Sequence, residues 1–260
     1  MSKISEQAKT FGISRQLLRY RLNTGWDIEK AKTAPYAIMQ HKDFPELTEK
    51  QLEIITGGLL GDAFIPQNKR SKGSNCCFCK EQRSDRLDYL QWHFDSLTPY
   101  SKKIYHLNKS ARKILNGKVT NNIEGNWYKS CIYRSCSHTV FTELRKKWYS
   151  DDGVKQIPFD IKLTPLSLAI WFCDDGNNNF KKHRIRFSTD AFTYTEIEFL
   201  SNLLESTFSI KSYISNEKCG HRLYVRTASY FDFLNVINDC LAWKSFAYKL
   251  NKKEEVLHDL

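Results

Sequence analysis

The sequence contains no uninterrupted apolar run that approaches the ~18 residues of a bilayer-spanning helix. Charged side chains interrupt the segment Met1 to Tyr20, so it also lacks the apolar core of a secretory signal peptide. Glycine and proline number only 11 and 6 in 260 residues, which excludes collagen-like and low-complexity chains. We therefore expect a soluble intracellular protein with no membrane contact, in the cytoplasm, the nucleoid or an organelle matrix.

Histidine and cysteine patterns typical of metal sites are also missing. The seven histidines are scattered, with no HxxxH pair or HNH-like group, so a ββα-metal nuclease is not supported. Cys76, Cys77 and Cys79 lie close together, but no paired CxxC or spaced histidine follows, so we interpret them as structural thiols. Eight cysteines in this length do not form the dense framework of a small secreted domain, which indicates a reducing compartment.

The composition favours a folded, basic protein. Hydrophobic residues make up 41% of the chain and aromatic residues 13%, enough to fill a core. The 40 Lys and Arg outnumber the 29 Asp and Glu, which gives a formal net charge of +11. A surplus of this size favours a polyanionic partner, and nucleic acid is the most common one for a soluble basic protein.

A helix-turn-helix pattern opens the chain. Apolar residues recur at helical spacing on both sides of Gly12, and Ser14 is a suitable N-cap for the second helix. That helix would present three polar side chains to a DNA groove, namely Arg15, Gln16 and Arg19. The run resembles the small DNA-binding modules appended to mobile-element nucleases, and a solvated helical hairpin is the alternative. We assign residues 1–35 to this segment and 36–43 to a linker.

Two later segments begin and end in the same way. Thr48 is a suitable N-cap with Gln51 three residues on, and Thr164 is the corresponding cap of the second segment. Both predicted helices finish on an acid, Asp62 in the first and Asp175 in the second. The matched caps and matched acids indicate one compact unit that occurs twice.

Strand and helix patterns follow each of these segments in the same order. A helical pattern covers 85–97 in the first copy and 194–207 in the second, where it follows a strand-like run at 183–189. The sequence therefore predicts an α+β fold of two pseudo-symmetric αββαββα halves. We place the first half at 44–158 and the second at 159–260.

Polar and apolar side chains alternate along two predicted strands of the second half. Such a strand turns its apolar residues to the helices and its basic and hydroxyl residues to the other face. That face suits a DNA groove, although an ordinary solvated sheet face remains the alternative for any single strand. The predicted DNA-binding residues here are Arg184, Arg186, Ser188, Arg222, Tyr224 and Arg226.

The two acid-ended helices are predicted to pack against each other. An aspartate at a helix C-terminus faces the negative end of the dipole, so another interaction must favour it. Gly57 and Gly61 lie four apart and allow a second helix to come close. Side-by-side packing would bring Asp62 and Asp175 together, where a divalent cation such as Mg²⁺ relieves their repulsion. We place four small residues at the helix interface: Gly57, Gly61, Ala169 and Cys173.

The motifs GGLLGDAFI and LTPLSLAIWFCDDG together resemble the paired signature of the LAGLIDADG homing endonucleases, in the single-chain subgroup with two motifs. The similarity extends over roughly Phe44 to Leu250. The resemblance implies a site-specific DNA endonuclease in which the motif helices form the interface between the halves. Each half would contribute a four-stranded antiparallel sheet, and the two sheets would straddle DNA as a saddle.

The resemblance also implies roles for individual residues. The catalytic, metal-binding acids fall on Asp62 and Asp175, with Mg²⁺ (or Mn²⁺) as the cofactor, while Asp174 is interpreted as structural. Lys155 and Lys249 match the lysines that assist catalysis near the scissile phosphates. The implied enzyme is a monomer that makes a double-strand break in a long, non-palindromic site of double-stranded DNA.

Two other functions are compatible with the same fold. An RNA splicing maturase would bind its host intron RNA, and a catalytically silent regulator would bind DNA without cutting it. Retention of both acids, Asp62 and Asp175, argues against the silent regulator. It does not exclude a maturase.

Overall fold

The computed structural model describes most of the chain. Described residues are 3–11, 15, 18–19, 22, 27–33, 44–67, 75–110, 113–115, 118–120, 127–218, 220–241 and 243–250. Contacts divide the chain into two compact units, Met1–Phe44 and Pro45–Leu260. Within the described part, every helix is too short or too polar to cross a bilayer.

The first unit holds helices α1 (Lys3–Thr10) and α3 (Ile28–Thr33). A small apolar core joins them, formed by Ala8, Leu18 and Ala31 with partly buried Ile4, Phe11, Leu22 and Ile28. Arg15 and Arg19 are helical and exposed, as a DNA-contacting helix requires, whereas Gln16 lies outside the described residues. The helix-turn-helix assignment therefore stays a prediction.

Each half of the second unit begins with a capped helix. Helix α4 (Glu49–Leu60) has Thr48 as its N-cap, and the expected capping box with Gln51 is present. Helix α7 (Pro165–Asp175) has Thr164 as its N-cap and proline at the first position, where a missing N–H has no consequence. The predicted starts of both helices are confirmed.

Each half also carries a four-stranded antiparallel sheet. The first sheet has the order β1-β2-β6-β3, with bounds β1 Ala63–Phe64, β2 Cys79–Arg83, β6 Trp127–Ser135 and β3 Ser101–Ser110. The second has the order β7-β8-β10-β9, with bounds β7 Gly176–Asn179, β8 Arg184–Phe187, β10 Gly220–Val225 and β9 Ser212–Glu217. The two orders are the same, 1-2-4-3, when only the four strands of each sheet are numbered in chain order.

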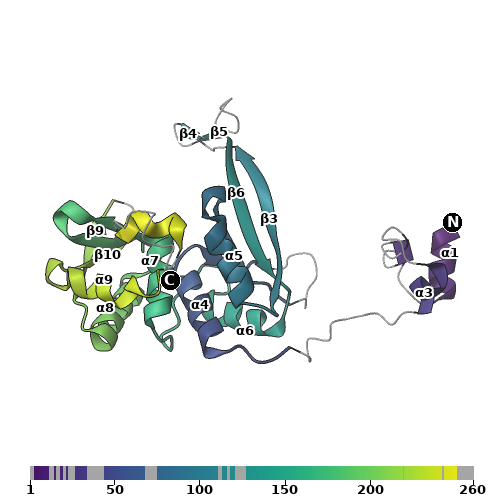
Figure 1. Ribbon diagram of the computed structural model, residues 1–260, viewed down its shortest axis with the longest axis horizontal. Coiled ribbons are helices and arrows are strands. Elements are labelled where there is room, and N and C mark those ends of the chain that lie inside the picture. Colours follow the sequence, from purple (N-terminus) through teal and green to yellow (C-terminus); the bar gives the residue numbers. More distant parts are fainter. Residues whose placement is uncertain are drawn as a thin grey trace. The chain divides into compact units, whose positions relative to one another are not determined.

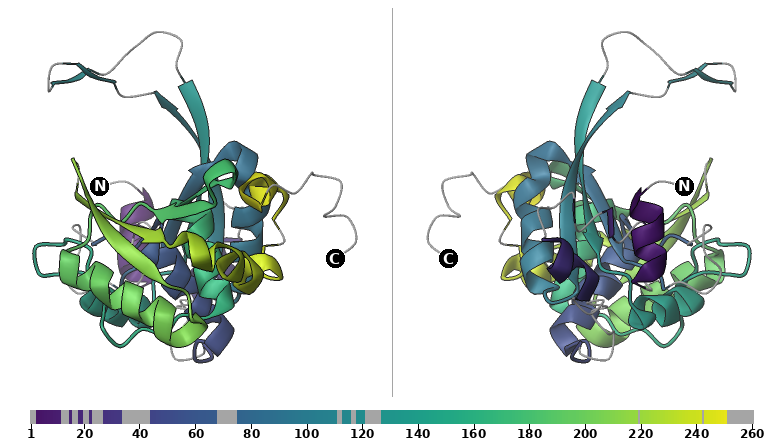
Figure 2. Two further views of the ribbon diagram at one scale, coloured as in Figure 1. Left: turned by 90° about the vertical axis from the view of Figure 1, so that its left-hand side faces the viewer. Right: turned by 90° about the vertical axis from the view of Figure 1, so that its right-hand side faces the viewer.

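The remaining helices complete the repeat. They are α5 (Leu87–Ser96) and α6 (Thr139–Trp148) in the first half, and α8 (Tyr194–Phe208) and α9 (Tyr230–Asn238) in the second. The prediction of two αββαββα halves is thereby confirmed. The first half also carries strands β4 (Lys113–Leu115) and β5 (Lys118–Thr120), which are inserted between β3 and β6 (Figures 1 and 2).

Apolar residues of the second sheet bury against α7 and α9, as the alternation predicts. Ile185, Phe187 and Leu223 are fully buried. The Phe187 ring stacks on Trp171 of α7 with centroids 4.0 Å apart, and Phe233 of α9 packs edge-on at 5.8 Å. This core fixes β8 beside α7 and so positions the acid at the end of α7.

Candidate active site

Helices α4 and α7 lie side by side at the centre of the second unit (Figure 1). A Cβ atom added to Gly57 would lie 2.4 Å from the carbonyl oxygen of Ser167 and 2.9 Å from the Ile170 Cβ atom. One added to Gly61 would lie 2.4 Å from the Asp174 Cβ atom. Only glycine allows this approach, since real Cβ atoms do not come within 3.0 Å of such neighbours.

On the α7 side, the atoms nearest to the two glycines belong to residues other than Ala169 and Cys173, whose place at the helix interface stays a prediction. Ala169 and Cys173 are fully buried, but neither is among the atoms nearest to the two glycines. The glycines contact positions 167, 170 and 174, which recur at helical spacing on one face of α7. Residues 169 and 173 are four apart and share a different direction around the helix.

The packing brings Asp62 and Asp175 to the same end of the helix pair. Asp62 follows Gly61, the C-cap of α4, and Asp175 is the last residue of α7. Burial, together with the charges of Asp62 and Asp174, raises the pKa of the Asp175 carboxyl to about 7 against the lowering effect of Lys155. Among the described residues, no side chain or backbone N–H donates a hydrogen bond to the Asp175 carboxylate.

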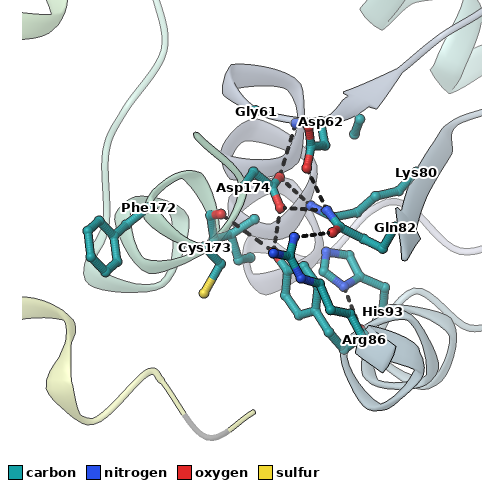
Figure 3. A network of polar contacts seen from close by, with 12 residues as sticks. Gly61, Asp62, Lys80, Gln82, Arg86, His93, Phe172, Cys173 and Asp174 are labelled. Atoms are coloured by element: carbon teal, nitrogen blue, oxygen red, sulfur yellow. Dashed lines mark hydrogen bonds and ion pairs between the residues drawn. The ribbon is translucent and has the colours of Figure 1, made fainter. Parts of the chain in front are cut away.

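Asp174 belongs to a buried network (Figure 3). Its Oδ2 atom pairs with the Lys80 ammonium in an ion pair whose two side chains are both fully buried. The same oxygen accepts the backbone N–H of Asp62 at 3.2 Å. Gln82 Nε2 bridges the two acids, at 2.6 Å from Asp62 Oδ2 and 3.3 Å from Asp174 Oδ1.

Sequence analysis did not identify Lys80 and Gln82. Both lie on β2 and point to the helix-covered face, where Lys80 is 0% and Gln82 4% exposed. A signal was present, because these polar residues continue the face that begins with buried Phe78. A charge on an otherwise buried strand face needs a partner, but the sequence does not say which acid supplies it.

Lys155 and Lys249 occupy corresponding places in the two halves. Lys155 Nζ donates to the carbonyl oxygens of Gly61 at 2.9 Å and Ala63 at 2.8 Å, at the end of α4. Lys249 Nζ donates to three carbonyl oxygens at the end of α7, those of Phe172, Cys173 and Gly176, at 2.6–2.8 Å.

Each ammonium therefore satisfies backbone acceptors at a helix C-terminus and offsets the negative charge gathered there. The pKa of Lys155 is lowered to about 8, and that of Lys249 is also lowered, because burial outweighs the raising effect of the nearby acids. Both lysines thus remain next to the paired acids without a direct ion pair to Asp62 or Asp175 in the described part of the chain.

The donor set fits a hard divalent cation that takes its remaining ligands from outside the protein. Within the described residues, no group of three His, Cys, Asp or Glu side chains would hold a metal without other ligands. Asp62 and Asp175 provide carboxylate oxygens, and those of Asp175 have no protein donor although the residue is partly buried. Mg²⁺ binds through one or two carboxylates and takes its other ligands from water and phosphate, which matches this arrangement.

The raised pKa of Asp175 predicts a stability effect in metal-free protein. A carboxyl whose folded pKa lies above its unfolded value loses stabilisation as pH rises from about 4 to about 7. Asp175→Asn removes the ionisable group, so its stability gain over the wild type should be about 2 kcal/mol larger at pH 8 than at pH 5. Thermal melts of both proteins in chelator test this, and an equal gain at both pH values would contradict it.

The polar face of the second sheet carries a hollow. It has a volume of about 210 Å³ and is lined by Asn177, Asn179, Arg184, Arg186 and Tyr224. These side chains come from adjacent strands, since Asn177 pairs with Arg186 and Arg186 with Tyr224. The hollow presents amide and guanidinium donors to the outside, which are the groups that recognise base edges and phosphates.

The predicted DNA-binding residues of the second sheet differ in exposure and in whether their polar groups are already paired within the protein. Ser188 and Arg226 are exposed. Arg222 is held by ion pairs to Asp190 at 2.8 Å and to Glu217 at 2.9 Å. Tyr224 is only 7% exposed and donates its hydroxyl proton to Glu217. Arg222 and Tyr224 are therefore already bonded to nearby acids of the same half, which the alternation along a strand does not reveal.

Comparisons with known proteins agree with this architecture. A family model described as the LAGLIDADG DNA endonuclease family matches residues 52–233. The chain is 32% identical over 168 residues to the cytochrome b mRNA maturase bI2 of Debaryomyces hansenii, a match that covers 64% of this chain and 60% of the maturase. The chain thus spans less than two thirds of that relative's length.

Two further relatives show more complete coverage. The chain is 25% identical over 206 residues to the probable intron-encoded endonuclease 1 of Wickerhamomyces canadensis, covering 76% of this chain and 82% of that protein. The structure of the homing endonuclease I-WcaI bound to its DNA recognition sequence superimposes with a TM-score of 0.68 at 23% identity. It covers 82% of this chain and 91% of that one. This likeness shows that the two proteins share a fold.

Proposed function

Because the chain belongs to the LAGLIDADG DNA endonuclease family, we propose that it is a site-specific homing endonuclease that makes a double-strand break in DNA. The observation that carries the proposal is the meeting of Asp62 and Asp175 at the seam of α4 and α7. Lys155 and Lys249 flank that seam symmetrically. One acid and one lysine from each half suit the cleavage of one strand by each half.

The proposed chemistry is hydrolysis of a phosphodiester bond. Bound Mg²⁺ (or Mn²⁺) would supply charge stabilisation and a water molecule of lowered pKa at the scissile phosphate. Asp62 and Asp175 would hold the cation through their carboxylates. Lys155 and Lys249 would keep the helix ends from repelling the phosphates and place positive charge beside the water that attacks.

Asymmetry between the halves supports a monomer that reads a non-palindromic site. Gly61, the C-cap of α4, stands opposite Asp174 of α7, and the first half carries the β4–β5 insertion, which the described residues of the second half lack. Two sheets of different sequence would contact different base pairs on the two sides of the break. A symmetric dimer would instead present the same surface twice.

The arginines of the hollow on the second sheet should contribute strongly to DNA binding. We expect Arg184→Ala or Arg186→Ala to weaken binding about tenfold, since a base or phosphate contact is worth ~1–3 kcal/mol. Arg222→Ala should weaken it less, because Asp190 and Glu217 already neutralise that guanidinium. Titrations with labelled target DNA at several salt concentrations measure this. Equal losses for Arg186→Ala and Arg222→Ala would contradict the assignment.

Cleavage of a candidate site tests the proposed function directly. The DNA that flanks this reading frame, rejoined without it, provides the candidate because a homing site is interrupted by the insertion. A plasmid with this rejoined sequence should be linearised in the presence of Mg²⁺ and stay intact in chelator. Tight binding without cutting in Mg²⁺ or Mn²⁺ would instead indicate a silent DNA-binding regulator.

A second candidate function is that of an RNA splicing maturase. The 32% identity to a cytochrome b mRNA maturase is the observation that favours it. Host intron RNA would then be a further partner, and DNA cleavage need not be lost. Splicing of the host intron with and without the protein tests this independently of the plasmid assay.

A further inference from the structure

The buried network around Asp174 holds Asp62, one of the two paired acids, through hydrogen bonds. Asp174 Oδ2 accepts the backbone N–H of Asp62 at 3.2 Å, and Oδ1 accepts the Tyr89 hydroxyl at 3.2 Å. Gln82 Nε2 holds the Asp62 carboxylate at 2.6 Å and touches Asp174 as well. Both the backbone and the side chain of Asp62 are therefore fixed by this network (Figure 3).

An ion pair buried on all sides anchors the network. Lys80 and Asp174 have no exposed side-chain surface, and Lys80 Nζ lies 4.7 Å above the Tyr89 ring. Apolar residues of similar size often replace a buried ion pair without loss of stability, so stability alone is a weak reason for this one. Its geometry provides another reason, because the Asp174 oxygen that pairs with the Lys80 ammonium is the same oxygen that accepts the Asp62 N–H.

The described residues of the second half form no equivalent network. The register that pairs Ala63 with Lys80 corresponds to the one that pairs Gly176 with Phe187, so a phenylalanine stands in the place of the lysine. Gly61 stands in the place of Asp174. Within the described part of the chain, no hydrogen-bond donor holds the carboxylate of Asp175, the partner of Asp62.

We propose that Lys80 and Asp174 are positioning residues that act on Asp62 and not on Asp175, and that they thereby set the rate at which one of the two DNA strands is cut. This inference rests on the proposed endonuclease function. A carboxylate held in place before DNA binds costs no reorganisation during the reaction, whereas the other must be ordered by metal and DNA. Cleavage of the two DNA strands should therefore depend on this network to different degrees.

Two double variants distinguish an effect on the position of Asp62 from an effect on the stability of the fold. Lys80→Met/Asp174→Leu replaces the ion pair by apolar residues of similar shape and removes the acceptor of the Asp62 N–H. Lys80→Met/Asp174→Asn also removes both charges but keeps an oxygen that accepts this N–H. The difference between them isolates the hydrogen bond to Asp62. A single Asp174 variant is avoided because it would leave the Lys80 ammonium buried and unpaired.

Cleavage is measured with the two DNA strands labelled separately, at saturating protein. In Lys80→Met/Asp174→Leu the ratio of the two strand-cleavage rates should change at least tenfold, so that nicked plasmid accumulates. In the asparagine variant the ratio should change less than threefold. Exchange of the exposed ion pair in Lys147→Met/Asp160→Asn should leave the ratio unchanged. Equal slowing of both strands, or an unchanged ratio in the leucine variant, would overturn the proposal.

A second measurement does not depend on cleavage. Hydrogen exchange at the Asp62 amide should be at least tenfold faster in the leucine variant than in the asparagine variant, with the Asp175 amide unaffected. If the wild type cuts no DNA, the endonuclease proposal fails, and this exchange rate still decides whether Asp174 positions Asp62. An Asp62 amide that exchanges equally slowly in both variants refutes positioning even if cleavage is strand-selective.

Discussion

Asp175→Asn is expected to slow DNA cleavage by about a thousandfold while DNA affinity changes little. The substitution removes one of two carboxylates proposed to hold the metal, and a bound metal supplies several kcal/mol of stabilisation to the transition state. Each ~1.4 kcal/mol corresponds to a tenfold change in rate. Single-turnover cleavage of the target plasmid in Mg²⁺, with binding measured in parallel, gives both quantities.

Asp151→Asn is the matched control, since Asp151 lies on an exposed turn of the same unit. It should cut within twofold of the wild type. Asp62→Asn should resemble Asp175→Asn, because the two acids face the same site. Cleavage by Asp175→Asn within tenfold of the wild type would remove the main support for a two-acid metal site.

Gly57→Ala is expected to destabilise the second unit by about 3 kcal/mol or more. The added Cβ atom would lie 2.4 Å from a backbone carbonyl oxygen of α7, which cannot rotate away as a side chain does. Helices α4 and α7 would have to separate, and their acids with them. For a unit of this size the melting temperature should fall by roughly 6–12 °C, as measured by calorimetry.

Gly58→Ala on the same helix controls for the change in helix propensity. Its Cβ would lie 3.1 Å from the tip of the Phe78 ring and 3.2 Å from the Ala63 side chain, contacts that small movements relieve. Alanine favours the helix by roughly 1 kcal/mol over glycine, so the two effects should nearly cancel. Similar melting temperatures for both variants would mean that the close helix contact does not limit stability.

Much of the fold followed from patterns within short stretches of sequence. Thr48 and Thr164 marked the starts of α4 and α7, and alternating residues such as Ile185 and Arg186 separated the two faces of the second sheet. These features are local, because caps and alternation depend on residues only a few positions apart. The repeat of the pattern then predicted two halves of the same topology.

The site was only partly visible in the sequence. Asp62 and Asp175 stood out by their matched positions, and Lys155 and Lys249 by their likeness to a family motif. The motif does not show that each lysine donates to carbonyls at a helix end, since these contacts join residues more than 70 positions apart. Nor does alternation show that Arg222 is already paired with acids.

The sequence by itself determined the helix caps, the duplicated order of elements and the two acids at the C-terminal ends of the motif segments. The tertiary structure decided which residues of α7 meet Gly57 and Gly61, and that Lys80 reaches Asp174 rather than another acid. The physical reason is the distance along the chain over which each interaction acts. Caps and periodicity act within one or two turns of the chain, whereas the partner of a buried charge depends on how distant elements pack.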